Sequence, residues 1–443
     1  MRWWLGAIVL LIVGMVFRLG LLVYAMYALL GVMLVSRFLS RSWIDNPAAE
    51  REASEEKREI GESTDIVIHL ENQGVLPVAW LLIEDSVPRD ALEEEPPRLR
   101  ILGSLLRVTQ LGIRSQKTLR YEVQFLTRGY FQFGPMLAET GDLFGLHRRY
   151  KVLTKPHFVL VLPKVIPLVN YNLASRRPMG EVRITHRLFE DPTRINGVRQ
   201  YQRGDPLNRV HWRATARTGE LHSKTYEPSC IAGLTVVLDF HAESYPARAR
   251  SFRTELAVTT AASLCHAVHL LRQQIGLVTN GRDAADRISQ EGWRHEFRTR
   301  AAAHSNVGMR SNNDRLRPVL VETRRGEGQM QQILETLARV ELTDGLSLAQ
   351  LLSETASRLP RNSTIVAVLG AVTDETAAAL GAMRRRGYAV MAVIILFDEP
   401  QHPDWARQPE WAGRLMSEGV SVRWIRNETE LTQLCSEQLV GAN

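Results

Sequence analysis

The feature that most constrains this sequence is the apolar run at its N-terminus. From Trp3 to Val35, a stretch of 33 residues, the only charged side chain is Arg18. A single helix of that length would rise about 50 Å, whereas the hydrocarbon core of a bilayer is about 30 Å thick. Arg18 would then lie near the bilayer centre, at a cost of roughly 2.5 kcal/mol or more. The run therefore predicts two shorter helices that reverse at Arg18, forming a transmembrane helical hairpin over residues 1–40.

The charges that flank the two apolar segments predict the orientation of this hairpin. Arg2 precedes the first segment, and Arg37 and Arg41 follow the second. Because Lys and Arg concentrate on the cytoplasmic side of membrane proteins, both ends should be cytoplasmic and Arg18 should lie on the far side. A cleaved signal peptide is the alternative, but no small-residue cleavage site follows the first segment and a second apolar segment comes at once. We expect a multi-pass membrane protein with cytoplasmic soluble domains.

The soluble part begins with a charged stretch and then a series of strands. Residues 41–62 carry an alternating acidic and basic run without apolar periodicity, which is typical of a solvated linker. Over residues 63–165 apolar and polar residues alternate, as at Ile66, Ile68 and Leu70. A period of two residues predicts half-buried strands, and we expect an antiparallel β-sandwich in this region.

The pattern changes to alternating strands and helices beyond residue 229. The buried strand predicted over Leu234–Phe240 is followed by a helical pattern over Arg250–Gln273, and the alternation continues toward the C-terminus. Such alternation predicts an α/β domain over residues 230–443, with a parallel sheet covered by helices on both faces. An Arg-rich insertion at about 281–328 shows no clear period. Residues 166–229 link the two folded regions.

Composition narrows the chemistry that the chain can perform. The 55 Lys and Arg exceed the 48 Asp and Glu, giving a net charge of +7, but only six of the 55 are Lys and none follows Lys224. Arg favours bidentate pairing with carboxylates or phosphates, whereas Schiff-base chemistry needs Lys. The three Cys are too widely spaced for a disulfide framework or a zinc ribbon. No nucleotide-binding or common hydrolase motif occurs, so we expect no catalytic residues, no cofactor and no enzyme activity.

The densest motif lies in the linking region. It follows the pattern G-x-R-x-Y-x-x-G-D-x-x-x-R-x-x-W-x-x-x-A-R, from Gly197 to Arg217. This pattern resembles the signature of the bacterial domain-of-unknown-function family 58, whose members are membrane-anchored. The resemblance extends to Arg128-Gly129-Tyr130, Phe133-Gly134-Pro135 and Gly141-Asp142-Leu143-Phe144-Gly145-Leu146, and to the layout of hairpin, sandwich and α/β domain.

The resemblance implies a fold, a location and partners rather than a reaction. It implies that the α/β domain is von Willebrand type A-like, with a Rossmann-like parallel sheet. It places the protein in the bacterial cytoplasmic (inner) membrane. It also implies association with MoxR-type AAA+ ATPases and with transglutaminase-like membrane proteins, and no established catalysis. We therefore expect a membrane-anchored, non-enzymatic scaffold or adaptor that docks cytoplasmic partners, in particular a MoxR-type ATPase, and that binds no specific nucleic acid.

Two interpretations of the signature remain open, and both can hold. In one, Asp205 and Arg209 pair to hold a turn that depends on Gly204, and Trp212 wedges between the two domains, because buried charges persist only when paired. In the other, the arginines line a surface that docks an anion or a partner. The candidate site residues are Arg199, Tyr201, Gly204, Asp205, Arg209, Trp212 and Arg217.

Two further alternatives concern other chemistry. In type A domains the motif D-x-S-x-S holds Mg²⁺, but here the corresponding stretch runs Asp239-Phe240-His241-Ala242-Glu243-Ser244. Only the Asp is retained, so a degenerate metal-dependent ligand-binding module would have Asp239, Ser244 and Asp374 as weak candidate ligands, and we expect no metal. An enzyme built around Asp205 and His211 is the second alternative, but it lacks a visible third catalytic group.

Overall fold

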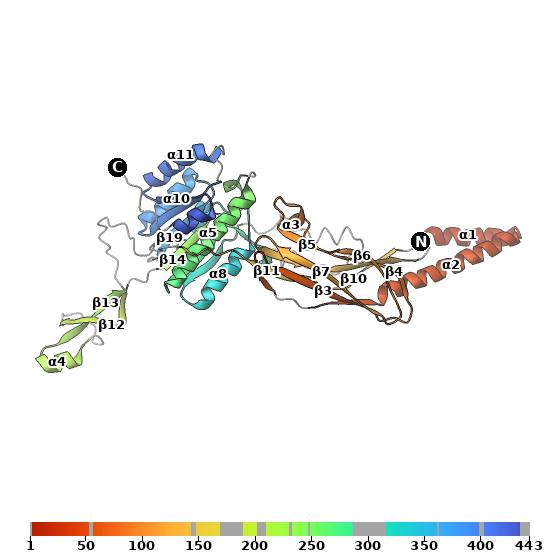
Figure 1. Ribbon diagram of the computed structural model, residues 1–443, viewed down its shortest axis with the longest axis horizontal. Coiled ribbons are helices and arrows are strands. Elements are labelled where there is room, and N and C mark those ends of the chain that lie inside the picture. The colour runs from red at the N-terminus through yellow and green to blue at the C-terminus, as the bar shows by residue number, and fades with distance from the viewer. Residues whose placement is uncertain are drawn as a thin grey trace. The chain divides into compact units, whose positions relative to one another are not determined.

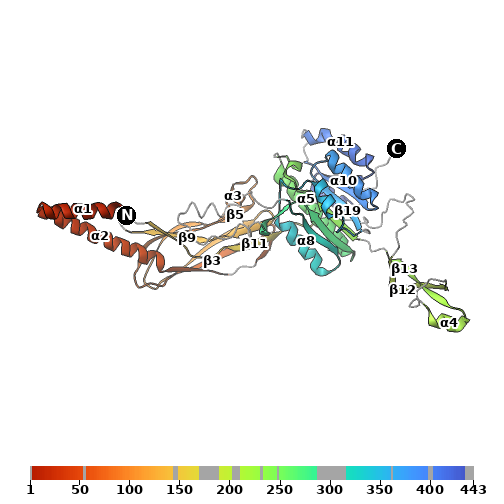
Figure 2. The same cartoon turned by 180° about the vertical axis from the view of Figure 1, so that it is seen from behind.

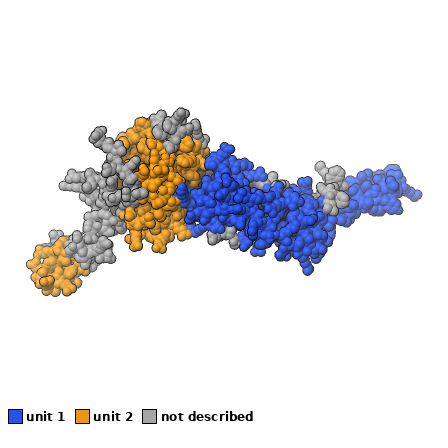
Figure 3. Space-filling model, in the orientation of Figure 1, with its two compact units in different colours: residues 1–164, 283–314, 335–340 blue, residues 165–282, 315–334, 341–443 orange. Residues whose placement is uncertain are grey.

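The computed structural model describes residues 2–52, 56–142, 148–168, 189–201, 210–229, 233–246, 249–286, 316–360, 363–397 and 403–434. The chain divides into two compact units, coloured separately in Figure 3. One consists of residues 1–164, 283–314 and 335–340, and the other of residues 165–282, 315–334 and 341–443.

Two helices open the first unit. Helix α1 (Arg2–Val16) and helix α2 (Gly20–Asp45) lie alongside one another in Figures 1 and 2. Arg18 adopts a left-handed conformation with φ of 48° between them, at the position where the charge interrupts the apolar run. By length and composition, α2 is the one helix in the described residues that is long and apolar enough to cross a membrane, and α1 contributes a shorter apolar stretch, Gly6–Val16.

The prediction of a solvated linker over residues 41–62 is wrong. Helix α2 continues to Asp45, and its last turns bury Ser36, Ser40 and Trp43. Strand β1 (Pro47–Arg51) then begins at once. Several of the charges in this stretch belong to edge strands, namely β1 and the separate strand Lys57–Glu59. In β1, Glu50 is exposed while the neighbouring Arg51 turns inward. Alternating charges on an edge strand and on a solvated linker look alike in a sequence.

Antiparallel sheets follow, as the alternating apolar pattern predicted. One four-stranded sheet has the order β1-β3-β7-β5 and a second has the order β10-β9-β4-β6, while β2 and β8 flank β11 in a third. All pairings are antiparallel except that of β2 with β11. The strands are β2 (Lys57–Glu59), β3 (Ser63–Asn72), β4 (Val78–Asp85), β5 (Leu99–Leu102), β6 (Leu106–Leu111), β7 (Gln116–Phe125), β8 (Gly129–Phe133), β9 (Met136–Gly141), β10 (Arg148–Val152) and β11 (His157–Leu162), with the short helix α3 (Asp90–Glu93) before β5.

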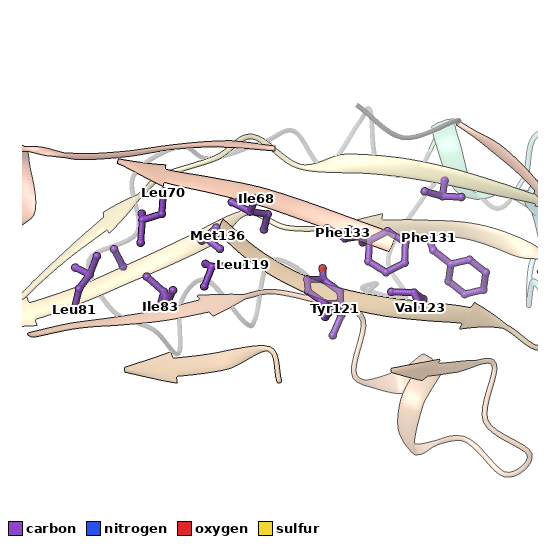
Figure 4. Packing of buried hydrophobic residues seen from close by; sticks show 14 of the residues in the cluster. Ile68, Leu70, Leu81, Ile83, Leu119, Tyr121, Val123, Phe131, Phe133 and Met136 are labelled. Atoms are coloured by element: carbon purple, nitrogen blue, oxygen red, sulfur yellow. The ribbon is translucent and has the colours of Figure 1, made fainter. Parts of the chain in front are cut away.

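A single apolar core lies between these sheets. Figure 4 shows Ile68 and Leu70 of β3 in the same cluster as Leu81 and Ile83 of β4, all of them 1% exposed or less. Successive side chains of a strand point to opposite faces, so residues two apart reach the same core. Trp43 of α2 belongs to this cluster as well, which makes the end of α2 part of the sandwich core.

The second unit is built on a six-stranded sheet of order β17-β15-β14-β19-β20-β21. Counted along the chain, this order is 3-2-1-4-5-6. The strands are β14 (Gly233–Leu238), β15 (Gln274–Thr279), β17 (Val319–Arg324), β19 (Ser363–Leu369), β20 (Ala389–Ile395) and β21 (Ser421–Ile425). The helices around this sheet are α5 (Arg250–Leu270), α8 (Glu327–Arg339), whose residues from 335 onward belong to the first unit, α9 (Leu348–Thr355), α10 (Asp374–Arg385), α11 (Pro403–Ser417) and α12 (Glu428–Gln433).

The sheet differs from the prediction in one strand. Strand β17 pairs antiparallel with β15, whereas the other pairings are parallel, so the sheet is mixed rather than fully parallel. An edge strand needs only one neighbour, so it can reverse its direction without disturbing the parallel core. Strand β17 and the start of α8 also occupy part of the insertion predicted at about 281–328, and residues 287–315 of that insertion lie outside the described residues.

A buried polar network in the sandwich generates a prediction about stability. Arg51 Nη2 lies 2.5 Å from Asp85 Oδ1, and the Tyr121 hydroxyl donates to Asp85 Oδ2 at 2.6 Å. Burial raises the pKa of Asp85, and the Arg51 charge and the two hydrogen bonds oppose that rise. Removing Asp85 would leave the Arg51 charge buried without its counter-ion.

We expect Asp85→Ala to lower the free energy of unfolding of the full chain in detergent by about 3 kcal/mol. Tyr121→Phe is the matched control, because it removes one hydrogen bond and should cost about 1 kcal/mol. Urea titration followed by tryptophan fluorescence measures both. Equal losses in the two variants would show that the ion pair contributes no more than the hydroxyl.

Candidate functional site

The signature region folds as a two-stranded ribbon that carries a short helix. Strand β12 (Phe189–Gln200) pairs antiparallel with β13 (His222–Ser229), and helix α4 (Trp212–Thr218) lies between them in the chain. Figure 1 shows α4 at one end of the ribbon. Of the predicted site residues, Arg199, Tyr201, Trp212 and Arg217 are described here, whereas Gly204, Asp205 and Arg209 lie outside the described residues.

Helix α4 is fixed at both ends by local hydrogen bonds. His211 is its N-cap, because the Nδ1 atom of its ring accepts a hydrogen bond from the Ala214 amide at 3.0 Å. At the other end Gly219 adopts φ of 77°, and its amide donates to the Thr215 carbonyl at 2.9 Å. The Thr215 hydroxyl accepts from the His222 amide of β13 at 3.1 Å. His211 therefore has a structural role that the sequence did not indicate, and its predicted pairing with Asp205 lies outside the described residues.

One face of α4 is open to solvent. We define the α4 face as Trp212, Arg213, Ala216 and Arg217, which are all exposed and recur at helical spacing. The Trp212 side chain is 67% exposed, and the interpretation that it wedges between the two domains stays a prediction. In the described part of the chain no carboxylate pairs with Arg213 or Arg217. The α4 face thus combines a large aromatic ring with two guanidinium groups that have no carboxylate partner among the described residues.

A second group of predicted residues lies at the carboxyl edge of the sheet in the second unit. Asp239 follows β14, and Asn280 follows β15, which is its parallel neighbour. The Asp239 Oδ1 atom accepts from Asn280 Nδ2 at 3.0 Å and from the His241 amide at 3.2 Å, and its Oδ2 atom accepts from the Ser244 hydroxyl at 2.6 Å. The sequence missed Asn280, although its position at the end of a strand adjacent to β14 was the signal that could have found it.

Asp239 and Ser244 thus come together, and Asp374 has a different partner. Burial raises the pKa of Asp239, while hydrogen bonds from Ser244, Asn280 and the His241 amide oppose that rise. The carboxylate of Asp374, at the start of α10, is 81% exposed and lies 2.9 Å from Arg414 Nε. Within the described ranges no three His, Cys, Asp or Glu side chains gather as a metal-binding group.

Side chains of this chain fill the crevice where α/β sheets usually bind ligands. The strand order reverses between β14 and β19, and ligands generally bind at the carboxyl ends of the strands at such a point. Here the Tyr245 hydroxyl donates to the Asp239 carbonyl at 2.8 Å, and Arg253 Nη2 donates to the carbonyls of Gly370 and Ile395, the latter at 2.8 Å. Both side chains are 0% exposed.

Gly370 permits this filling. A Cβ atom at this position would lie 2.5 Å from the Ser244 carbonyl oxygen, so only glycine lets the loop after β14 approach the end of β19 so closely. The sequence reasoning also missed Arg253. The pattern that could have revealed it is its position in helical phase with the buried Leu256, Ala257 and Thr260.

The Arg128-Gly129-Tyr130 motif has a structural role in the first unit. Arg128 is 4% exposed, and its Nη1 atom lies 2.7 Å from the Leu337 carbonyl and 3.0 Å from the Val340 carbonyl. These carbonyls belong to the last turn of α8 and the residue after it, within residues 335–340 of the same unit. A Cβ on Gly129 would lie 2.7 Å from Arg98 Nη2 and 2.8 Å from the Phe131 ring, so the strand needs glycine there.

Comparison with known proteins finds a match to the family that the motif resembles. Residues 197–303 match the family model described as "Protein of unknown function DUF58". The "Uncharacterized protein YeaD" of Bacillus subtilis (strain 168) is 23% identical over 287 residues, which are 63% of this chain and 68% of that protein. The resemblance predicted from residues 197–217 is therefore confirmed, and the chain contains a DUF58 region.

Two solved structures that this chain resembles match part of its length. A von Willebrand factor type A protein from Catenulispora acidiphila is 14% identical, covers 48% of this chain and 42% of its own, and has a TM-score of 0.27. The native alpha-2-macroglobulin of E. coli is 16% identical and covers 27% of this chain, with a TM-score of 0.20. This chain spans only 7% of the alpha-2-macroglobulin chain.

The burial of Asp239 generates a prediction about pH. Burial raises the pKa of Asp239 in the folded state, so the folded protein favours the protonated carboxyl group. The stability that this protonated group contributes is complete below the pKa of an unfolded Asp, about 3.9. That contribution is lost as the pH rises through the higher pKa of the folded protein. Asp239→Asn cannot ionise, so we expect its melting temperature relative to the native chain to increase between about pH 4 and about pH 8.

Thermal unfolding of the full chain in detergent at both pH values measures this difference. Asp239→Ala is the control, because it leaves the donors of Ser244 and Asn280 without an acceptor and should be less stable than Asp239→Asn by about 2 kcal/mol. If Asp239→Asn instead falls further below the native chain as the pH rises, the ionised carboxylate is the stabilising form.

Proposed function

We propose that this protein is a membrane-anchored, non-enzymatic scaffold that docks a cytoplasmic protein on the α4 face. The observation that carries the proposal is the 67% exposed Trp212 beside Arg213 and Arg217, which have no carboxylate partner in the described residues. Trp and Arg are the residue types most enriched among those that dominate binding energy at protein interfaces. Unpaired guanidinium groups favour an acidic surface on the partner.

The second unit supports a binding role rather than catalysis. Its sheet order, 3-2-1-4-5-6, is that of doubly wound folds and supports a von Willebrand type A-like, Rossmann-like assignment. Tyr245 and Arg253 occupy the point where the strand order reverses. Their hydrogen bonds to the backbone account for these buried side chains without a bound substrate. The scaffold would therefore act through its outer surface.

The N-terminal helices supply the proposed anchor. Helix α2 exposes apolar side chains along its length, including Leu21 at 90% and Leu34 at 58%. We propose that α1 crosses the bilayer beside it as the other half of a hairpin, since long or aromatic side chains at its ends can extend a short span. The flanking Arg2, Arg37 and Arg41 favour cytoplasmic soluble domains at the bacterial inner membrane.

The family resemblance supports the identity of the partners. We propose a MoxR-type AAA+ ATPase as the protein that docks on the α4 face, and a transglutaminase-like membrane protein as a second member of the assembly. The scaffold would hold the ATPase at the membrane and supply no chemistry of its own.

Affinity purification from gently solubilised, crosslinked membranes tests this proposal. We expect the native chain to recover an AAA+ ATPase. Trp212→Ala and the double variant Arg213→Glu/Arg217→Glu should each reduce the amount of ATPase recovered by roughly fivefold or more. The charge-matched control is Arg325→Glu/Arg358→Glu, which changes two exposed arginines elsewhere in the same unit. Failure of the native chain to recover any ATPase would contradict the partner, and equal recovery by all variants would contradict the surface.

A second candidate function is a degenerate metal-dependent ligand-binding module. The observation that favours it is the 2.6 Å contact between the Asp239 carboxylate and the Ser244 hydroxyl, two groups of the kind that bind Mg²⁺. Under the scaffold proposal, titration of Mg²⁺ or Mn²⁺ into the full chain should give no binding heat. Heat that is present in the native chain and lost in Asp239→Asn would favour the metal-dependent module instead.

A further inference from the structure

Helix α2 and the sandwich form one continuous body where the apolar run ends. The last turns of α2 bury Ser36, Ser40 and Trp43, and Trp43 belongs to the sandwich core. Arg149 of β10 reaches this part of the helix, since its Nε atom donates to the Ser40 hydroxyl at 3.4 Å. The helix therefore does not end in a flexible joint, and the position of the sandwich follows directly from the depth of α2 in a membrane.

Three arginines gather at this junction. We define the α2 collar as Arg37 and Arg41 of α2 together with Arg149 of β10. Arg37 and Arg41 are exposed and lie one turn apart on the helix. Ser40 lies between these two arginines in the sequence, and Arg149 is half-buried beside Ser40. The collar thus brings together two elements that are more than 100 positions apart in the chain.

The collar lies at the depth of lipid headgroups if α2 spans the bilayer. At 1.5 Å per residue, Arg37 lies about 3 Å and Arg41 about 9 Å beyond Val35, the last residue of the apolar run. The polar layer of one leaflet is about 5–8 Å thick, from the difference between the whole bilayer and its hydrocarbon core. Both arginines and the Arg149 side chain at Ser40 therefore fall in or at the edge of that layer.

Within the described part of the chain, the charge of the collar is not neutralised by an acidic side chain. Among the described residues no carboxylate pairs with Arg37, Arg41 or Arg149. The neighbouring cations have other partners: Arg148 lies 3.5 Å from Glu139, and Lys151 donates to the carbonyls of Asp45 and Pro47 at 2.7 and 2.9 Å. Asp45, the one acidic residue at this end of α2, is exposed, and among the described residues it forms no ion pair with the collar.

We propose that the α2 collar binds the phosphate of an anionic phospholipid, such as phosphatidylglycerol. The inference rests on the proposed membrane crossing by α2. Guanidinium groups pair with phosphate oxygens through two parallel hydrogen bonds, and each basic residue near an anionic leaflet adds to the attraction. Bound lipid would fix the rotation of α2 about its axis and, because α2 and the sandwich are one body, the orientation of the sandwich on the membrane.

Binding of soluble short-chain lipids to the full chain in detergent tests the proposal. The probes are dioctanoyl phosphatidylglycerol, dioctanoyl phosphatidylcholine and inorganic phosphate, and the measurement is binding by native mass spectrometry together with the shift in melting temperature. We expect the native chain to bind phosphatidylglycerol roughly tenfold or more tightly than phosphatidylcholine, because three cations face the phosphate. The variant Arg37→Gln/Arg41→Gln/Arg149→Gln should lose this preference to within about twofold.

Two controls make the outcomes distinct. The variant Arg89→Gln/Arg100→Gln/Arg120→Gln removes the same charge from exposed positions of the same unit and should keep the preference for phosphatidylglycerol. If the collar variant folds poorly, Arg149→Gln alone should still weaken the binding of phosphatidylglycerol and leave that of phosphatidylcholine unchanged.

Equal binding of the two lipids by the native chain, or an equal loss in both triple variants, would overturn the proposal. Inorganic phosphate that matches phosphatidylglycerol would also overturn it, since the site would then take a free anion. Extraction of membranes with alkaline carbonate tests the anchor separately, because release of the native chain would contradict the membrane crossing itself rather than the lipid preference.

Discussion

The structure of the second unit depends on the hydrogen bonds that its side chains make to backbone carbonyl groups at the carboxyl edge of the sheet. Carbonyl groups at the ends of β19 and β20 would be buried without partners if Arg253 did not donate to them, and buried unpaired polar groups are costly. The Arg253 guanidinium in turn lies 5.7 Å from the centre of the Tyr245 ring, whose hydroxyl holds the Asp239 carbonyl. One buried cation therefore occupies the region in which a related sheet would bind a ligand.

The two surfaces that we propose for interaction suit different partners. The α4 face presents an aromatic ring and two arginines from a helix whose ends are fixed by His211 and Gly219. The α2 collar presents arginines at the depth expected for lipid headgroups, on a helix whose end belongs to the sandwich core. Together they support a protein that is oriented by the membrane at one end of its sequence and bound by a protein partner through its DUF58 region.

Much of the secondary structure was predictable because it follows from patterns of neighbouring residues. The alternation at Ile66, Ile68 and Leu70 predicted strands, and the buried run after Gly233 predicted the first strand of the α/β sheet. The charged stretch after α2 was not predictable, because alternating charges fit an edge strand as well as a linker. The antiparallel direction of β17 was hidden for a similar reason, since side-chain period does not depend on the direction of a strand.

The sequence by itself determined the apolar N-terminus with its interruption at Arg18, the two folded regions and the DUF58 signature, because each is a property of neighbouring residues. Only the tertiary structure decided that Asn280 and Ser244 donate hydrogen bonds to the carboxyl group of Asp239. It also decided that Arg253 donates to the carbonyls at the sheet edge and that Arg149 lies beside Ser40. These contacts join residues that the sheet order and the packing of α2 bring together. No local pattern encodes such pairings, because hydrogen bonding and burial depend on distance in space rather than on separation in the chain.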